Sequence, residues 1–181
     1  GQAKYNNYVG ETDACFNGER VKIDLDTSTG GYIVTAAAGT AMVGVLNGVL
    51  FTDATTLKPT FSNFYPAATT PANSEDVTAF VNDDPFQEYI IASDATLGGD
   101  LATRKSKIGL TYATTAAAGS TTTGKSSVQL GISTAATTAK QLRVVRVAED
   151  PENEDQTAAN CSLVVKVNLH QYTVGSLATG I

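Results

Sequence analysis

The sequence predicts an all-β fold: an antiparallel β-barrel or β-sandwich of about ten short strands, joined by long loops rich in Thr, Ala and Gly. Apolar and polar residues alternate with a period of two wherever a period can be measured. Turn-forming residues separate the alternating runs, and no segment sustains a helical period. Because side chains on a strand point to opposite faces in turn, each alternating run indicates a half-buried strand.

Four runs show the alternation most clearly, at residues 21–26, 108–113, 128–133 and 163–170. In each run Val, Ile, Leu or Tyr occupies every second position, which predicts one buried face. Gly, Asn, Asp and Pro supply the backbone conformations that tight turns need. The turn signals between strands are Thr29-Gly30-Gly31, Ala38-Gly39-Thr40, Asn47-Gly48, Gly98-Gly99-Asp100, Ala118-Gly119-Ser120 and Asp150-Pro151.

Helix signals are weak. The best candidate is residues 94–107, but Gly98 and Gly99 lie inside it, so we expect about one or two helical turns there. Residues 113–127 and 133–140 are of low complexity, which is typical of surface loops.

We expect one β-rich domain, at residues 18–181, because a chain of this size buries enough surface for a single core. Residues 1–17 are polar and lack a clear strand period, so they are predicted to form an N-terminal arm that extends and contacts a partner. The start of the chain has no basic patch followed by an apolar run, so no signal peptide is expected.

The charge balance argues against nucleic acid as a partner. The chain carries 12 Lys and Arg against 18 Asp and Glu, a net charge of −6. Binding to DNA or RNA depends on basic residues that neutralise phosphates, and the basic cluster at residues 104–107 is too small to reverse the balance. The apolar-leaning stretch at residues 32–51 is interrupted by Gly, Asn and Thr, so no membrane span is expected either.

Cys15 and Cys161 are the two thiols of the chain. Two Cys in a chain of this length do not make a disulfide framework. Two buried free thiols are favoured, and a single bridge between them is the alternative.

Residues 119–126 match the phosphate-binding pattern G-x-x-x-x-G-K-[ST]. That chemistry needs a helix directly after the loop, whose N-terminus meets the phosphates. A run with strand period follows instead, so nucleotide binding is not predicted.

Candidate catalytic and metal-binding residues are few. His170 is the single His, which excludes a His-pair metal site and weakens any Ser-His-Asp triad; we expect a solvated or interface side chain. Residues 149–155 hold five carboxylates around Pro151 and indicate a solvated loop, with a hard cation or a salt-bridge partner as the alternative. Paired carboxylates can hydrolyse glycosides, but the chain has no Trp to form a sugar platform. No enzyme activity, metal site or cofactor is predicted.

Aromatic residues crowd the middle of the chain. They form either one end of the core or a patch that faces another protein, since large aromatics anchor interfaces. The crowded residues are Phe51, Phe61, Phe64, Tyr65, Phe80, Phe86 and Tyr89. The candidate protein-contact residues are Tyr5, Tyr8 and Phe16 in the arm, and Phe61, Phe64 and Tyr65.

Three stretches each combine a strand with a turn and carry no catalytic group. They are residues 44–53 with 59–67, residues 76–89, and residues 142–147 with 150–153 and 164–171. In this order and combination they resemble the small head-decoration, or cement, proteins of tailed bacteriophages. Together they cover under half of the chain.

The resemblance implies a β-rich structural protein, often a homotrimer, on the outer surface of the virion capsid at local threefold positions. It would be made in the host cytoplasm, bind the major capsid protein and tie neighbouring subunits together against the pressure of packaged DNA. An acidic protein is not drawn to the packaged genome, which agrees with an external position. Three weak contacts made by one trimer add up to lasting attachment.

Two other functions stay open. A tail, fibre or receptor-binding part of the virion would be present in few copies per particle, where a shell protein is present in hundreds. A carbohydrate-binding β-module would bind glycans, although the absence of Trp argues against it.

Overall fold

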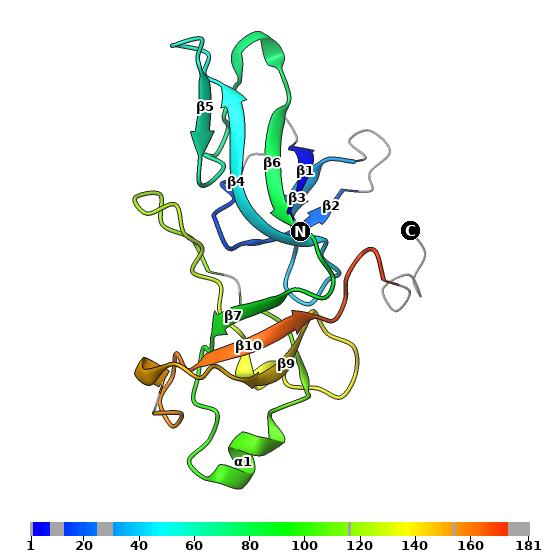
Figure 1. Ribbon diagram of the computed structural model, residues 1–181, viewed down its shortest axis with the longest axis vertical. Coiled ribbons are helices and arrows are strands. Elements are labelled where there is room, and N and C mark those ends of the chain that lie inside the picture. The colour runs from blue at the N-terminus through cyan, green and yellow to red at the C-terminus, as the bar shows by residue number, and fades with distance from the viewer. Residues whose placement is uncertain (1, 8–12, 25–30, 116, 154, 174–181) are drawn as a thin grey trace.

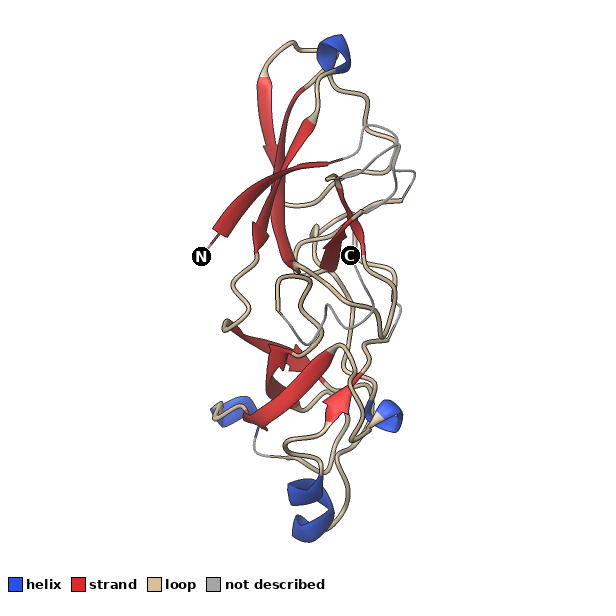
Figure 2. Cartoon of the chain, turned by 90° about the vertical axis from the view of Figure 1, so that its right-hand side faces the viewer, coloured by secondary structure: helices blue, strands red, loops and turns tan. Residues whose placement is uncertain are grey.

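The computed structural model describes residues 2–7, 13–24, 31–115, 117–153 and 155–173. Within these residues, ten strands form two separate sheets, and the chain has one short α-helix (Figure 1). The predicted all-β class is therefore confirmed. The sheets follow one another along the long axis of the molecule, and the helical turns lie at its periphery (Figure 2).

The first sheet holds six strands in the order β2-β3-β1-β6-β4-β5. Their bounds are β1 (Gln2–Asn7), β2 (Arg20–Ile23), β3 (Ile33–Thr35), β4 (Gly44–Thr52), β5 (Pro59–Ser62) and β6 (Val77–Asn82). Paired strands are antiparallel, except that β1 and β3 are parallel. β2 also pairs with β4, so the sheet curls back on itself. Val77, Ala79 and Val81 alternate along β6 and are each 0% exposed, which places the first core on this face.

The second sheet holds four strands in the order β7-β10-β9-β8, all antiparallel. Their bounds are β7 (Glu88–Ala92), β8 (Thr111–Tyr112), β9 (Leu142–Val147) and β10 (Ser162–Val167). Leu163, Val165 and Val167 alternate along β10 and pack with Tyr112 and Leu142 in a second hydrophobic cluster. Each sheet therefore has its own core, built from alternate positions of its strands.

The N-terminal segment belongs to the first sheet. β1 pairs with β6 along its whole length and meets β3 at Asn7. Further on, Cys15 and Tyr65 exchange two backbone hydrogen bonds, with N···O distances of 3.1 and 2.7 Å. Residues 2–7 and 13–17, the described parts of the predicted arm, are thus built into the domain, which corrects the expectation that they extend from it. The rest of that arm lies outside the described residues.

The helix agrees with its prediction. α1 (Leu101–Ser106) lies inside the expected segment and is less than two turns long. The Asp100 carboxylate accepts hydrogen bonds from the backbone N–H and the hydroxyl of Thr103, at 2.9 and 2.6 Å, and caps the first turn. In the described part of the chain, three short 3-10 helices lie at Ala72–Ser74, Ile132–Thr134 and Pro151–Asn153.

The predicted strand at residues 128–133 is wrong. Leu130 makes isolated bridges, and the chain then turns into a 3-10 helix. Leu130 and Ile132 are both buried in the second core, so the alternation predicted their burial correctly. However, the backbone N–H of Ile132 donates to the Asp94 carboxylate at 2.8 Å rather than to a neighbouring strand.

Both cysteines are buried free thiols, as favoured by the sequence. Cys15 lies in the core of the first sheet and Cys161 in the core of the second. The alternative of a bridge between them is not formed.

The chain joins the two sheets again after β10. Met42 and His170 form a bridge, and the backbone N–H of Met42 donates to the carbonyl of Leu169 at 2.9 Å. The Gln171 side chain accepts from the backbone N–H of Ile23 at 2.7 Å and donates to the Ile23 carbonyl at 3.1 Å. The segment after the second sheet is therefore anchored on the first.

His170 is buried at this junction, with 1% of its surface exposed, so the expected solvated or interface position is wrong. Its Nε2 lies 3.0 Å from the carbonyl oxygen of Asp83, and its Nδ1 accepts the backbone N–H of Tyr172 at 3.1 Å. Because Nδ1 accepts, the ring is neutral and carries its proton on Nε2. Burial lowers the pKa of His170, although hydrogen bonding to the Asp83 carbonyl and the carboxylates of Asp83 and Asp84 oppose this.

Lowering the pH from about 7.5 to about 5 is expected to destabilise the protein through His170. In the unfolded chain, His170 binds a proton near its ordinary pKa of about 6.5, whereas in the folded chain it binds one only at lower pH. The free energy of unfolding therefore falls below about pH 6.5. This decrease in the free energy of unfolding ends below the pKa of His170 in the folded protein, and its slope is at most about 1.4 kcal/mol per pH unit. Urea unfolding of the protein and of His170→Gln across this range measures it. Parallel pH profiles would contradict the prediction, because His170 is the single His.

Candidate protein-binding surface

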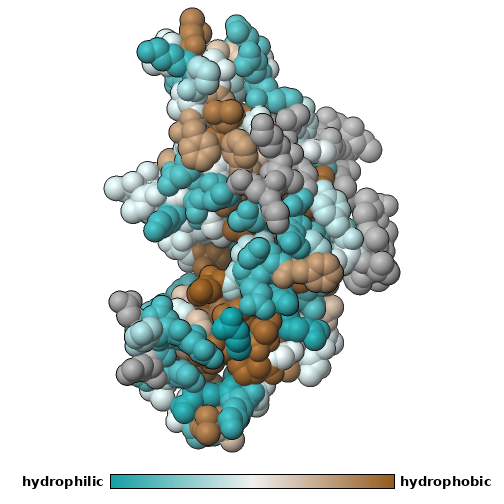
Figure 3. All heavy atoms as spheres, in the orientation of Figure 1, coloured by the Kyte–Doolittle hydropathy of each residue, from teal (hydrophilic) through white to brown (hydrophobic). Residues whose placement is uncertain are grey.

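Large apolar side chains are exposed at the edge strands of both sheets. β5 ends the first sheet and β7 ends the second. Phe61 on β5 is 61% exposed, Phe86 just before β7 is 79% exposed, and Ile90 on β7 is 71% exposed. We call these three the edge residues. Apolar side chains also gather over both sheets on the face shown in Figure 3.

Phe61 is held in place by its own sheet. Its ring centroid lies 6.0 Å from that of Phe80, and the ring also lies over Gly48. A Cβ atom at Gly48 would lie 2.6 Å from Cζ of Phe61, so Gly is needed for this approach. The sheet thus presents an ordered aromatic side chain to solvent.

The other predicted contact residues lie elsewhere. Phe64 is half-buried and stacks on Phe16, with centroids 5.4 Å apart and 8° between the rings. Phe16 is 7% exposed and Tyr65 is 0% exposed, so neither is positioned to contact a partner. Tyr5 lies in β1, within the first sheet, and Tyr8 lies outside the described residues.

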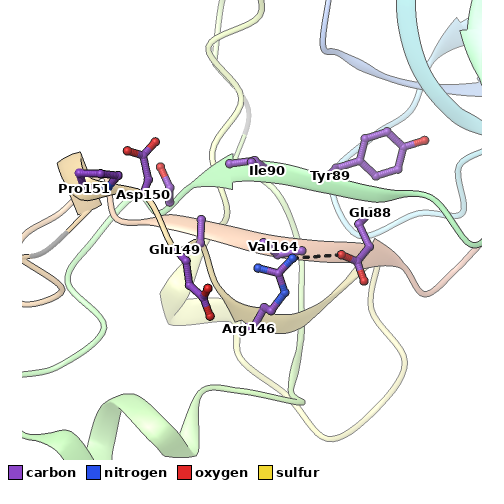
Figure 4. A pocket seen from close by; sticks show the side chains of 10 residues that line it. Glu88, Tyr89, Ile90, Arg146, Glu149, Asp150, Pro151 and Val164 are labelled. Carbon is purple, nitrogen blue, oxygen red and sulfur yellow. Dashed lines mark hydrogen bonds and ion pairs between the residues drawn. The ribbon is translucent and has the colours of Figure 1, made fainter.

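A pocket of about 540 Å³ lies on the outer face of β7, β10 and β9 (Figure 4). Tyr89 and Ile91 pack against the second core, so alternation places Glu88 and Ile90 on this outer face. Ile90 pairs with Val164, which is only 3% exposed. The pocket therefore has an apolar centre between two neighbouring strands.

Charged side chains surround this apolar centre. The Glu88 carboxylate lies 3.5 Å from Nη2 of Arg146 and 3.5 Å from Nζ of Lys166. All three side chains are 40–52% exposed, and exposed pairs of this kind add only about 0–1 kcal/mol to stability. An apolar centre with a charged rim that includes Arg is the composition of protein interfaces.

The acidic loop that begins at Glu149 forms the other end of the pocket. Glu149 and Asp150 line it and are exposed. Asn153 holds the loop in shape: its Nδ2 donates to the carbonyls of Ala148 and Ser162 at 2.9 Å each, and its Oδ1 accepts from Ser162 N at 2.8 Å. Within the described ranges, no three His, Cys, Asp or Glu side chains are grouped as a metal ion would need.

The segment that matches the phosphate-binding pattern has a different role. Residues 121–124 form a turn closed by a bridge between Ser120 and Lys125, and the residues that follow, up to Leu130, are not helical. A Cβ at Gly119 would lie 2.3 Å from the Phe16 ring, and a Cβ at Gly124 would lie 2.3 Å from Asn63 Oδ1. Both glycines are therefore explained by close packing of this loop, and no helix N-terminus follows it in residues 127–130 to hold a phosphate.

No family model matches this chain, and neither a curated protein nor a solved structure matches it. Among the described residues, no helix has both the length and the apolar character to cross a membrane.

Sequence reasoning missed Ile90 and its charged neighbours Glu88 and Arg146. One signal was available: Tyr89, Ile90 and Ile91 are consecutive apolar residues, which indicates a strand that is apolar on both faces. Such a strand either lies between two layers or exposes apolar surface. The outer face of β7 is the exposed case.

Proposed function

We propose that this chain is a structural virion protein that binds the outer surface of a bacteriophage capsid and links neighbouring major capsid subunits, with three copies forming a trimer. The observation that carries the proposal is the exposure of Phe61, Phe86 and Ile90 at the edges of the two sheets. Exposed large apolar side chains mark places where another protein binds.

The edge strands support the same function. Backbone N–H and C=O groups on an edge strand can pair with a strand of a neighbouring protein. The edge residues lie on or next to β5 and β7, so backbone pairing and apolar contact would be made at the same place. The net charge of −6 agrees with a position outside the shell, away from nucleic acid.

Replacing Ile90 by Asp is expected to lower capsid binding at least about tenfold, because a charge replaces an apolar anchor at the centre of the contact. Ile90 is 71% exposed, so the folded state should tolerate the change. Binding is measured by sedimentation of the purified protein with heads of the encoding virus assembled without it. Bound copies are counted per head.

Leu101→Asp is the matched control, because Leu101 is a 57% exposed apolar residue on α1, away from both edge strands. It should bind as the unaltered protein does, in hundreds of copies per head. Heads that do not bind the unaltered protein would refute capsid binding. An equal loss for Leu101→Asp would show that the edge strands are not the contact, and a few copies per particle would favour a tail part.

A further inference from the structure

A second pocket, of about 400 Å³, lies between the two sheets. Its residues come from both: Arg20 and Val45 from β2 and β4, and Ile91 and Val165 from β7 and β10. Met42, from the segment between β3 and β4, also lines it. Sites for small molecules have volumes of roughly 300–1,000 Å³ and mostly apolar walls, and this pocket fits both criteria.

Arg20 brings a charge to this apolar pocket. Its neighbour in β2, Val21, is 0% exposed in the first core, so alternation directs Arg20 to the other side of the strand, where Val45 pairs with it. Arg20 is only 6% exposed. An Arg buried to this degree is normally paired, because burying an unpaired charge is costly.

The hydrogen bonds of Arg20 are incomplete. One terminal nitrogen, Nη1, donates to the carbonyl of Thr115 at 3.5 Å. Nε has no hydrogen-bond partner among the described residues, although its atom is fully buried. The adjacent Glu19 carboxylate accepts from the backbone N–H of Phe16 at 3.1 Å and offsets part of the Arg20 charge. Arg20 lines the pocket, and its guanidinium keeps one buried N–H donor without a partner among these residues.

We propose that this pocket binds a small amphipathic monocarboxylate, of the medium-chain fatty acid class. Its carboxylate would accept hydrogen bonds from the Arg20 guanidinium, since a guanidinium edge matches the two oxygens of a carboxylate. Its aliphatic chain would lie against Met42, Val45 and Val165. One guanidinium in apolar surroundings matches a single negative charge with an apolar tail. Of the three edge residues, Ile90 also lines this pocket, while Phe61 and Phe86 do not.

Titration of the full chain with sodium octanoate, followed by calorimetry and by amide NMR, tests the proposal. We expect saturable binding of one octanoate, with shifts confined to residues around the pocket. Octanol, which has the same tail without the charge, should bind at least tenfold more weakly. No saturable octanoate binding at millimolar concentration, or equal binding of octanol, would overturn the proposal. This comparison needs no variant and so does not depend on how a variant folds.

Arg20→Met keeps an apolar side chain of similar length and removes the charge, so it should weaken octanoate binding at least tenfold. Arg143→Met is the matched control, since Arg143 is an exposed Arg on β9, and it should bind as the unaltered protein does. Retained affinity in Arg20→Met, or an equal loss in Arg143→Met, would count against a carboxylate site at Arg20.

Discussion

Deleting residues 1–7 is expected to abolish cooperative folding of the first sheet. The deletion removes β1, which lies between β3 and β6 and pairs with β6 through six residue pairs. Without it, the edge of β6 loses its hydrogen-bond partners and the sheet loses an inner strand. An ordinary domain is stabilised by only about 5–15 kcal/mol, so the loss of an inner strand is enough to unfold the sheet.

Urea unfolding followed by circular dichroism measures this. The unaltered protein should give a sigmoidal transition, and the deletion variant a shallow, non-cooperative one. Adding a synthetic peptide of residues 1–12 should restore the transition, while a scrambled peptide of the same composition should not. A deletion variant with an unchanged midpoint would instead support a partner-contacting arm, as expected from the sequence alone.

Replacing Gly44 by Ala should destabilise the protein by roughly 3 kcal/mol, at the upper end for overpacking a core. A Cβ at Gly44 would lie 2.1 Å from the carbonyl oxygen of Asn82 and 3.0 Å from Cγ1 of Val81. The first contact is with backbone, which cannot rotate away. Because β4 pairs with both β2 and β6 at this end, any shift disturbs two neighbours.

Gly99→Ala is the matched control for this substitution. A Cβ atom at Gly99 would have nothing within 4 Å, and the residue lies in the exposed turn before α1. The free energy of unfolding of this variant should differ from that of the unaltered protein by less than about 0.5 kcal/mol. Equal midpoints for the Gly44 and Gly99 variants in urea unfolding would show that β4 can move away from β6.

Strands whose burial repeats every second residue were predictable from the sequence. The run at residues 163–170 contains most of β10, and that at 21–26 contains most of β2. β1 was missed because only two of its six residues, Ala3 and Tyr5, are hydrophobic, and two residues are too few to show an alternation. Pairing with β6, seventy to eighty residues away in the chain, decides its structure, and such pairing leaves no local signal.

The candidate surface was predictable only in part. Phe61, Phe64 and Tyr65 lie within five residues, and nothing in their spacing tells which of them is exposed. Tyr65 is buried where its backbone pairs with that of Cys15, while Phe61 stays exposed on an edge strand. Arg20 was not singled out, because its burial depends on contacts between the two sheets.

The pairing of β1 with β6 also has a consequence for biosynthesis. Gln2 lies opposite Asn82, so β1 is translated some eighty residues before the strand that it pairs with. During that interval the nascent chain carries an unpaired strand, which is open to association with other chains. Slower translation or a lack of chaperones should therefore lower the soluble yield before it affects the finished protein.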